Sequence, residues 1–237
     1  MFDKIENSPN KKTAKLENVK SLSKQVYEKT SVEAKSQVSD SIQDHTKHKT
    51  GNWVALTFDD GPSPKYTPEI LGILNKYHIK ATFCIIGEEA KKFPYLVKDI
   101  VASGNKLCDH TMTHDERLPS KSDKDIKHEI LGDKELLEQI APNAKIDYYR
   151  APGGAWSPHV RELAASWGLE PLGWSVDTRD WARPGVASIL NSIKTEFKPG
   201  GVILMHDGGG NRDQTVSALK QIIPDFIKKG YQFDFPR

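Results

Sequence analysis

The sequence contains few cysteines, no long apolar run and no excess of either charge. Its 237 residues include only 2 cysteines, too few for a fold held together by several disulfides. No run approaches the roughly 18 apolar residues of a membrane-spanning helix, and no signal peptide is visible, because Met1 opens a polar segment. The net charge is +2, from 34 basic and 32 acidic residues, so the composition gives no indication of nucleic-acid binding. A Gly-x-Ser-x-Gly motif, which serves serine hydrolases, is absent as well.

The two cysteines, Cys84 and Cys108, both lie in apolar, strand-like runs. They can form one disulfide or remain two buried thiols, and the sequence leaves both arrangements open. We expect a structural role rather than a catalytic one, because unpaired cysteines are usually buried.

The first 50 residues differ in composition from the rest of the chain. They contain ten Lys, seven acidic residues and no Gly or Trp. Leu16, Val19, Leu22 and Val26 recur at helical spacing, but the apolar face that they make is thin. We therefore predict a polar, Lys-rich stalk or linker over residues 1–50, partly helical or disordered, followed by a domain over residues 51–237.

From residue 51 onward, short apolar runs alternate with amphipathic stretches. The apolar runs predict strands at 53–58, 81–86, 106–109, 146–149, 171–176, 201–205 and 231–233. The amphipathic stretches predict helices at 67–77, 88–103, 123–140, 157–167, 185–197 and 213–229. This alternation predicts an α/β protein with a parallel sheet and crossover helices. Seven strands suit a closed or nearly closed barrel, and a doubly wound open sheet is the alternative.

Ionisable residues follow five of the predicted strands. The clusters are Asp59-Asp60, Cys108-Asp109-His110, Tyr149-Arg150, Asp177-Thr178-Arg179-Asp180-Trp181 and Met205-His206-Asp207. In parallel α/β folds, sites collect at the carboxyl ends of the strands, which lie on one face. Five clusters on that face predict an active site.

His110 and His114 are four residues apart, a spacing that places both imidazoles on one side of a helix or tight turn. Together with Asp60, at the end of the first strand, they form a His-His-Asp set. Three protein ligands with one open position are typical of catalytic zinc sites, and the same set serves non-haem iron oxygenases. Asp59 then faces the cavity and can act as a base toward water.

His206 ends an apolar run and is either a buried structural residue or a catalytic acid. Histidine can donate a proton near neutral pH, provided that a partner holds its charge and tautomer. Asp180 is the best candidate for that partner. Arg150 can pair with Asp59 and keep it ionised, and Gly153 leaves a backbone N–H open to an oxyanion.

Five motifs stand in a characteristic order along the chain. They are Thr57-Phe58-Asp59-Asp60-Gly61-Pro62, His110-Thr111-Met112-Thr113-His114, Arg150-Ala151-Pro152-Gly153-Gly154, Asp177-Thr178-Arg179-Asp180-Trp181 and Leu204-Met205-His206. In this order they resemble the motifs of the polysaccharide deacetylase family, the family 4 carbohydrate esterases with the NodB homology domain. The resemblance covers about residues 51–235.

The resemblance implies a distorted (β/α) barrel and a metal-dependent enzyme that removes N- or O-linked acetyl groups. It implies that a divalent metal, expected to be zinc with cobalt or another ion as alternatives, is held by Asp60, His110 and His114. It also assigns Asp59 as base, His206 as acid, Arg150 and Asp180 as the side chains that orient them, the Gly153 amide as oxyanion donor, and Trp181 and Leu204 as walls around the acetyl methyl. Many family members carry an aromatic residue after the proline of the third motif, where this chain has glycine.

The expected substrate is a polymer or oligomer of N-acetylglucosamine, either chitin-like or peptidoglycan, and no nucleic acid. Acetylxylan is the alternative substrate, and a non-catalytic glycan-binding domain or an iron-dependent redox enzyme are the rival functions. We expect a monomer that is secreted or acts in the cell envelope, by family resemblance. Trp156 follows the third motif and is a candidate for contact with the sugar.

Overall fold

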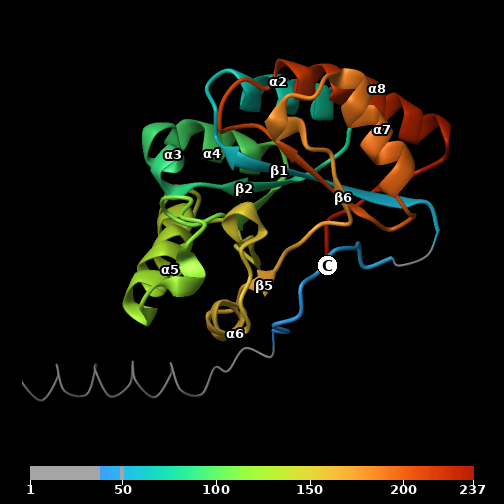
Figure 1. Ribbon diagram of the computed structural model, residues 1–237. Coiled ribbons are helices and arrows are strands. Elements are labelled where there is room, and N and C mark those ends of the chain that lie inside the picture. The colour runs from blue at the N-terminus through green and yellow to red at the C-terminus, as the bar shows by residue number, and fades with distance from the viewer. Residues whose placement is uncertain (1–37, 49–50) are drawn as a thin grey trace, which may run out of the picture. The chain divides into compact units, whose positions relative to one another are not determined.

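Strand β1 (Trp53–Gly61) lies at the centre of a parallel sheet, and the other elements are arranged around it (Figure 1). The computed structural model describes residues 38–48 and 51–237. Residues Val54 to Phe58 are fully buried, as expected for a central strand that is covered on both faces. Of the predicted stalk over residues 1–50, residues 1–37 and 49–50 lie outside the described residues, so its helical or disordered character stays a prediction.

The sheet has the strand order β5-β4-β3-β2-β1-β7-β6, and β8 pairs with β1. The strands are β2 (Thr82–Ile85), β3 (Lys106–Asp109), β4 (Tyr148–Tyr149), β5 (Glu170–Pro171), β6 (Val176–Asp177), β7 (Val202–His206) and β8 (Gln232–Phe233). Every pair along this path is parallel. The predicted distorted barrel is therefore confirmed, as a curled sheet whose path ends at β5 on one side and β6 on the other.

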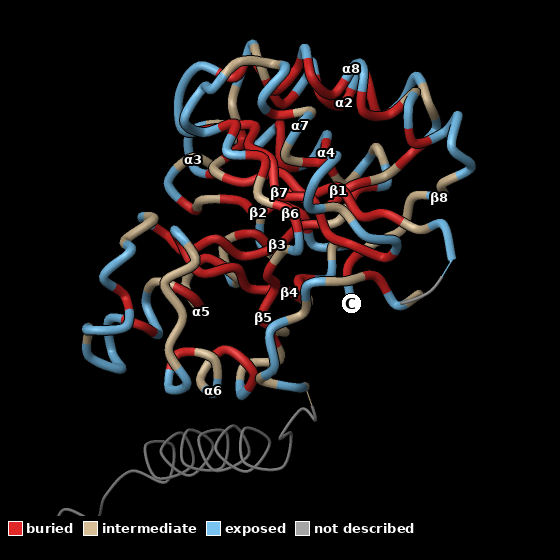
Figure 2. The backbone as a smooth tube through the Cα atoms, turned by 45° about the vertical axis from the view of Figure 1, so that its right-hand side comes forward, coloured by how far each residue is buried: buried red, intermediate tan, exposed pale blue. Residues whose placement is uncertain are grey.

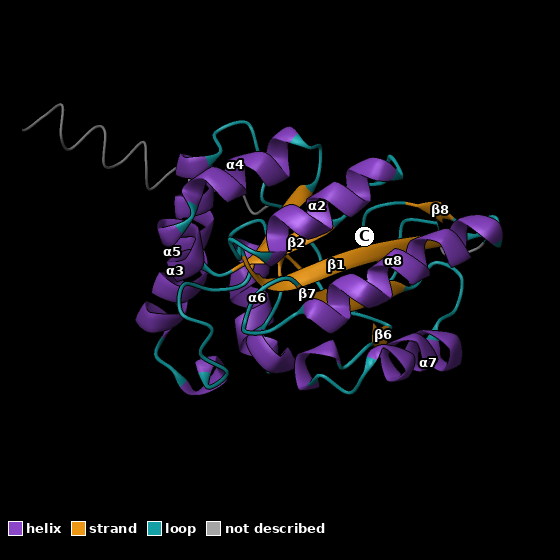
Figure 3. Ribbon diagram, turned by 90° about the horizontal axis from the view of Figure 1, so that it is seen from above, coloured by secondary structure: helices purple, strands orange, loops and turns teal. Residues whose placement is uncertain are grey.

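Helices cover the outside of this sheet (Figure 3). They are α2 (Tyr66–Lys76), α3 (Gly87–Lys92), α4 (Pro94–Ala102), α5 (Asp123–Ile140), α6 (Pro158–Ser166), α7 (Val186–Glu196) and α8 (Asp213–Lys228). In Figure 2 the buried residues concentrate in the strands and on the helix faces toward them. Helix α8 shows why one helix face is buried. Its apolar residues recur every three or four positions and so share one face, and they are buried: Val216, Leu219, Ile223 and Phe226.

Two predicted elements are divided in the structure. The helix predicted over 88–103 is broken before Pro94, because proline lacks an N–H and disfavours the helical conformation of the residue before it. The strand predicted over 171–176 is two short strands, β5 and β6. Between them the chain leaves β4 and turns toward β7, and the Gly173 N–H bonds to Gln43 instead of a neighbouring strand.

The segment 38–48 bonds to the β5 side of the curled sheet and to the chain at the start of β7. On the β5 side, the Gln43 N–H donates to the carbonyl of Pro171 (2.8 Å), and on the β7 side the Thr46 N–H donates to Gly200 (2.8 Å). Isolated bridges pair Gln43 with Leu172, His45 with Gly201 and Thr46 with Pro236. Figure 1 shows this segment, in blue, running from beside β5 toward the C-terminus. These residues, which precede the sequence-based boundary at residue 50, are thus bonded to the sheet.

Cys84 and Cys108 form a disulfide between β2 and β3. The strand register places the two residues directly opposite each other, with their Cα atoms 4.2 Å apart. Both side chains are fully buried. Of the two arrangements that the sequence left open, the structure has the single bridge.

Reduction of this disulfide is expected to lower the free energy of unfolding by about 3 kcal/mol, because a bridge across 24 residues restricts the unfolded chain. Urea unfolding followed by circular dichroism, with and without reductant, measures the change. The double variant Cys84→Ala/Cys108→Ala is the control, since its midpoint should not respond to reductant. Equal midpoints for the oxidised and reduced wild-type protein would contradict the assignment.

Candidate functional site

The carboxyl ends of the strands surround a cavity of about 600 Å³. Eight of the ten predicted site residues line it: Asp59, Asp60, His110, His114, Gly153, Trp181, Leu204 and His206. The other two, Arg150 and Asp180, are buried beside it and bond to the residues that line it. The structure therefore brings together all ten residues that the sequence predicted, from five different segments of the chain.

Asp60, His110 and His114 form a group that can hold a metal ion. One potential ligand atom from each residue lies within 4.8 Å of the other two. Asp60 Oδ1 is 3.3 Å from His114 Nε2 and 3.5 Å from His110 Nε2. Asp60 and His114 have positive φ angles of 71° and 59°. Asp60 lies at an irregularity near the end of β1, between Asp59 and Gly61, and His114 lies in the loop after β3.

The chemistry of this group fits a divalent metal. His110 Nδ1 donates to the Arg150 carbonyl oxygen at 2.8 Å, which leaves the lone pair of Nε2 directed at Asp60. Asp60 Oδ1 is buried, and no described residue donates a hydrogen bond to it. Burial opposes the ionised form of Asp60, but the charges of His110, His206 and His114 lower the pKa of its carboxyl. An ionised oxygen without a donor, beside two imidazole nitrogens, is the ligand set of a catalytic metal site.

Asp59 is held next to this group by Arg150. The guanidinium Nη1 donates to Asp59 Oδ1 at 2.7 Å and to Thr57 Oγ1 at 2.8 Å. Its other nitrogens donate to the carbonyls of Leu172 (3.0 Å) and Gly173 (2.8 Å). The second oxygen, Asp59 Oδ2, is 3.6 Å from the nearest imidazole nitrogen of His110. One carboxylate oxygen is thus fixed by a charge and the other faces the metal-binding group.

His206, the register partner of Asp59 on the neighbouring strand β7, is held by Asp180. Asp180 Oδ1 is 2.7 Å from His206 Nδ1, while Oδ2 accepts from the His206 backbone N–H (2.9 Å) and from Thr215 Oγ1 (2.6 Å). Burial alone would lower the pKa of His206, but the Asp180 hydrogen bond and the charges of Asp180, Asp59 and Asp60 raise it to about 9. Burial likewise opposes the charge of Asp180, and its bonds to His206 and Thr215 hold its pKa below the ordinary value.

Gly153 follows the proline of the third motif in a left-handed conformation, with φ 58° and ψ 12°. No described residue accepts a hydrogen bond from its backbone N–H. Leu204 is buried in β7, whereas Trp181, which is 52% exposed, stands at the rim of the cavity. A free N–H and two apolar walls are therefore present where the sequence predicted them.

Other residues of the cavity have no signal in the sequence. Arg212 resembles an exposed charge at the start of a helix, but it is buried, and it donates to the carbonyls of Gly208 (2.6 Å), Gly209 (3.0 Å) and Trp181 (3.3 Å). Gly209 packs so closely on the Asp60 carboxylate that a Cβ would collide with it. Arg212 thus ties together two loops that border the cavity.

Two tryptophans line the cavity, the predicted Trp181 and also Trp174. Trp174 lines the cavity, and the Arg150 guanidinium lies 5.6 Å from its ring centroid. Trp156, the candidate from sequence, packs edge-on against Tyr149 with ring centroids 5.7 Å apart and is absent from the cavity lining. The sequence shows only that Trp156 lies in the loop after the third motif. It does not show that its ring packs against Tyr149.

Three buried acids beside the cavity, Asp109, Asp133 and Asp207, accept hydrogen bonds from the residues around them. Asp133 Oδ2 accepts from the His110 backbone N–H (3.3 Å), and Asp109 Oδ1 accepts from the Thr111 N–H (2.9 Å). Burial raises the pKa of both carboxyls well above the ordinary value. Burial also raises the pKa of Asp207 to about 7, although the Thr67 hydroxyl donates to it. The loops that carry the metal-binding residues are therefore anchored to the interior.

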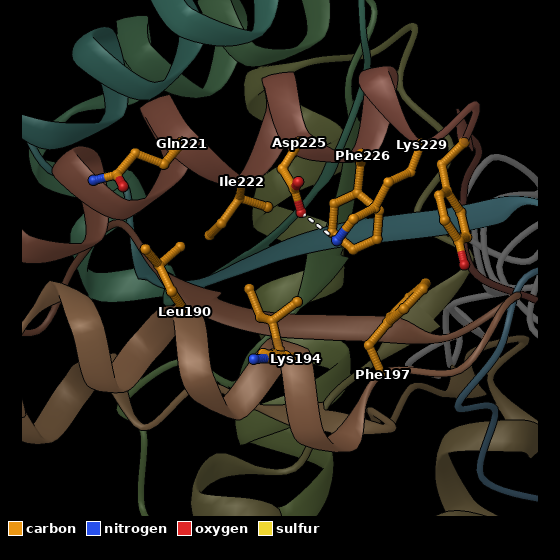
Figure 4. A pocket seen from close by; sticks show the side chains of 10 residues that line it. Leu190, Lys194, Phe197, Gln221, Ile222, Asp225, Phe226 and Lys229 are labelled. Atoms are coloured by element: carbon orange, nitrogen blue, oxygen red, sulfur yellow. Dashed lines mark hydrogen bonds and ion pairs between the residues drawn. The ribbon is translucent and has the colours of Figure 1, made fainter.

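A second groove of about 540 Å³ lies between α7 and α8 (Figure 4). Apolar and aromatic side chains line it, including Leu190, Phe197 and Phe226, with the exposed Asp225–Lys229 ion pair at its edge. None of the predicted site residues lines this groove. The candidate site is accordingly the cavity at the carboxyl ends of the strands.

Comparison with known proteins finds a matching family and several similar proteins. The family described as polysaccharide deacetylase matches residues 46–172. A chitooligosaccharide deacetylase of Sinorhizobium fredii is 39% identical over 188 residues, which cover 75% of this chain and 87% of that protein. The chain belongs to the polysaccharide deacetylase family. This membership confirms the predicted family and enzyme class.

Further relatives of this polysaccharide deacetylase have related names. A peptidoglycan-N-acetylglucosamine deacetylase of Bacillus cereus is 41% identical over 182 residues, covering 76% of this chain and 84% of the relative. A solved peptidoglycan N-acetylglucosamine deacetylase aligns with a TM-score of 0.75 and 34% identity, covering 82% of this chain and 89% of that one. A family 4 pseudoenzyme from Bacillus anthracis aligns with a TM-score of 0.73 and 28% identity, covering 79% and 65%. Because the family thus includes a pseudoenzyme, activity has to be argued from the site residues of this chain as well as from family membership.

The His206–Asp180 pair predicts a pH dependence. In chelator-treated protein, the His206 imidazole should titrate near pH 9, above its ordinary value of 6.5. Because the folded pKa is raised, the stability from this pair is fully present below pH 6.5 and is lost as the pH rises through about 9. An NMR titration of the imidazole, together with unfolding measured across this pH range, tests both statements.

Substitution Asp180→Asn should lower the pKa of His206, because burial then acts without its main opposing charge. Asp123→Asn is the matched control, since Asp123 pairs with an exposed histidine, His159, on the surface. A His206 that titrates at the same pH in the wild-type and Asp180→Asn proteins would contradict the assigned pair.

Proposed function

We propose that this polysaccharide deacetylase hydrolyses the acetamido groups of N-acetylglucosamine residues in chitin-type oligosaccharides or peptidoglycan. The observation that carries the proposal is the convergence, in one cavity, of the Asp60-His110-His114 group, the Asp59–Arg150 pair and the His206–Asp180 pair. The names of the similar proteins from Sinorhizobium fredii and Bacillus cereus support the choice of substrate.

Asp60, His110 and His114 would hold a divalent ion, with zinc as the expected ion and cobalt or another divalent ion as alternatives. A bound divalent ion supplies two effects, polarisation of the acetyl carbonyl and a lower pKa of water, which falls to about 7 on zinc. Asp60, His110 and His114 all line the cavity, so an oxygen of a substrate in the cavity can approach the ion that they would hold.

Asp59 is the proposed base. Its Oδ2 faces the metal-binding group and can take a proton from the attacking water, while Arg150 holds Oδ1 in place. The oxygen of that water forms a bond to the acetyl carbon. The free N–H of Gly153 is the proposed donor to the carbonyl oxygen as it becomes negative.

His206 is the proposed acid. Its raised pKa keeps it protonated at neutral pH, with Asp180 balancing the charge. When the carbon–nitrogen bond breaks, His206 gives its proton to the leaving amine, and acetate is the other product. Trp181 and Leu204 would enclose the acetyl methyl.

We further propose that the protein acts outside the cytoplasm, where its polymeric substrates would lie, and as a monomer. The buried disulfide between β2 and β3 supports the location, because disulfides persist in oxidising compartments. Among the described helices, none has the length and apolar character needed to cross a bilayer.

Acetate release from chitooligosaccharides, peptidoglycan and acetylated xylan, with and without a chelator, tests the proposal. We expect release from the first two substrates, its loss on chelation and its recovery with zinc or cobalt. Release from xylan alone would assign the chain to the acetylxylan esterases. No release from any substrate after metal reconstitution would favour a non-catalytic glycan-binding domain.

The variant Asp59→Asn should lower kcat by about 100-fold or more, in line with the usual contribution of a general base. It should still bind metal, because Asp59 is not one of the three grouped ligands. The exposed-site variant Asp123→Asn is the control. Unchanged acetate release in Asp59→Asn would remove Asp59 from the role of base.

A further inference from the structure

Glu116 forms part of the wall of the cavity, two residues after His114. Its side chain fills the space beside Gly153. A Cβ atom placed on Gly153 would lie 2.8 Å from Glu116 Cδ and 3.0 Å from Glu116 Oε1. The glycine after the motif proline thus makes room for a carboxylate at the cavity wall, next to the backbone N–H proposed to face the reacting carbonyl oxygen.

The charge of Glu116 acts on the imidazole of His114, but its carboxylate has no close partner within the described part of the chain. No ion pair or hydrogen bond joins its side chain to any of these residues, whereas its neighbour Asp115 pairs with Arg117 (3.0 Å) and Lys121 (2.9 Å). Glu116 is exposed, so its carboxylate keeps full contact with the solvent of the cavity.

The other acids that line the cavity already have partners, and one of them, Asp177, accepts a hydrogen bond from the Arg179 backbone N–H (2.9 Å). Asp59 pairs with Arg150, and Asp60 faces the imidazoles of His110 and His114. Glu116 is therefore the carboxylate on the His114 side of the cavity that is available to an incoming sugar. A carboxylate accepts hydrogen bonds from hydroxyls, attracts ammonium groups and repels other carboxylates.

We propose that Glu116 sets the charge preference of this deacetylase: it favours glycans whose units beside the reacting acetamide are neutral or carry a free amine, and disfavours units that carry a carboxylate. This inference rests on the proposed function and narrows it. Chitin-type chains, which are uncharged or become cationic as acetyl groups leave, fit the site better than glycans that carry lactyl carboxylates.

Three glycans of equal length test the preference. They are an N-acetylglucosamine tetramer, a tetramer that alternates with N-acetylmuramic acid units bearing free lactyl carboxylates, and the same muramic glycan with those carboxylates amidated. The amidated glycan keeps the bulk of the lactyl group and removes its charge. The quantity measured is kcat/KM for acetate release at low salt and at high salt.

The wild-type enzyme should prefer the neutral and amidated tetramers over the carboxylate-bearing one. Glu116→Gln should raise kcat/KM on the carboxylate-bearing glycan about two- to fivefold relative to the neutral one, as expected for one solvent-exposed charge pair. Glu116→Lys should change the ratio further in the same direction. The changes should shrink at high salt, because ions screen exposed charges.

Glu162→Gln is the control, because Glu162 is an exposed acid on α6 outside the cavity lining, and its removal changes net charge by the same amount. Circular dichroism and melting temperature confirm that each variant folds. If the wild type deacetylates the neutral tetramer but both Glu116 variants keep the wild-type ratio at low salt, the role of Glu116 is wrong and the proposed function stands. If no glycan releases acetate, the proposed function is overturned and the preference with it.

Discussion

The buried guanidinium of Arg150 is the interaction on which the rest of the site depends. It bonds to Thr57 and Asp59 on β1 and to the carbonyls of Leu172 and Gly173 beyond β5. Its own backbone carbonyl accepts from His110, so a single residue fixes both the proposed base and a proposed metal ligand. A buried charge is tolerated only when its donors are satisfied. The local structure around Arg150 is therefore determined by electrostatics as much as by packing.

Each reactive group of the cavity is positioned by a group that does not itself react. Asp180 receives bonds from His206 and Thr215, and Asp133 accepts from the backbone N–H of His110. Some supporting groups, such as Asp133 and Thr215, come from helices, whereas Arg150 and Asp180 follow the strands β4 and β6. A parallel sheet gathers strand ends at one edge, so Arg150 and Asp180 lie beside the groups that they position.

Much of this could be predicted from the sequence. Strand β3 and helix α5 have the predicted limits, because their apolar patterns are regular and their ends carry strong signals. Periodicity cannot show tertiary partners. It could not reveal that 171–176 changes partner midway, that Arg212 turns inward to bind carbonyls, or that Trp174 and not Trp156 borders the cavity. The domain boundary and the catalytic roles of the site residues stay predictions.

The attachment of residues 43–46 has a consequence for the order in which the chain can fold. Gln43 pairs with Leu172, His45 with Gly201 and Thr46 with Pro236. Residues near the start of the described chain therefore pair with residues more than 100 positions later, some of them near its end. Such distant pairings are slow to form, because the entropy of closing long loops must be overcome first. During synthesis, these pairings therefore cannot be complete until Pro236 has left the ribosome.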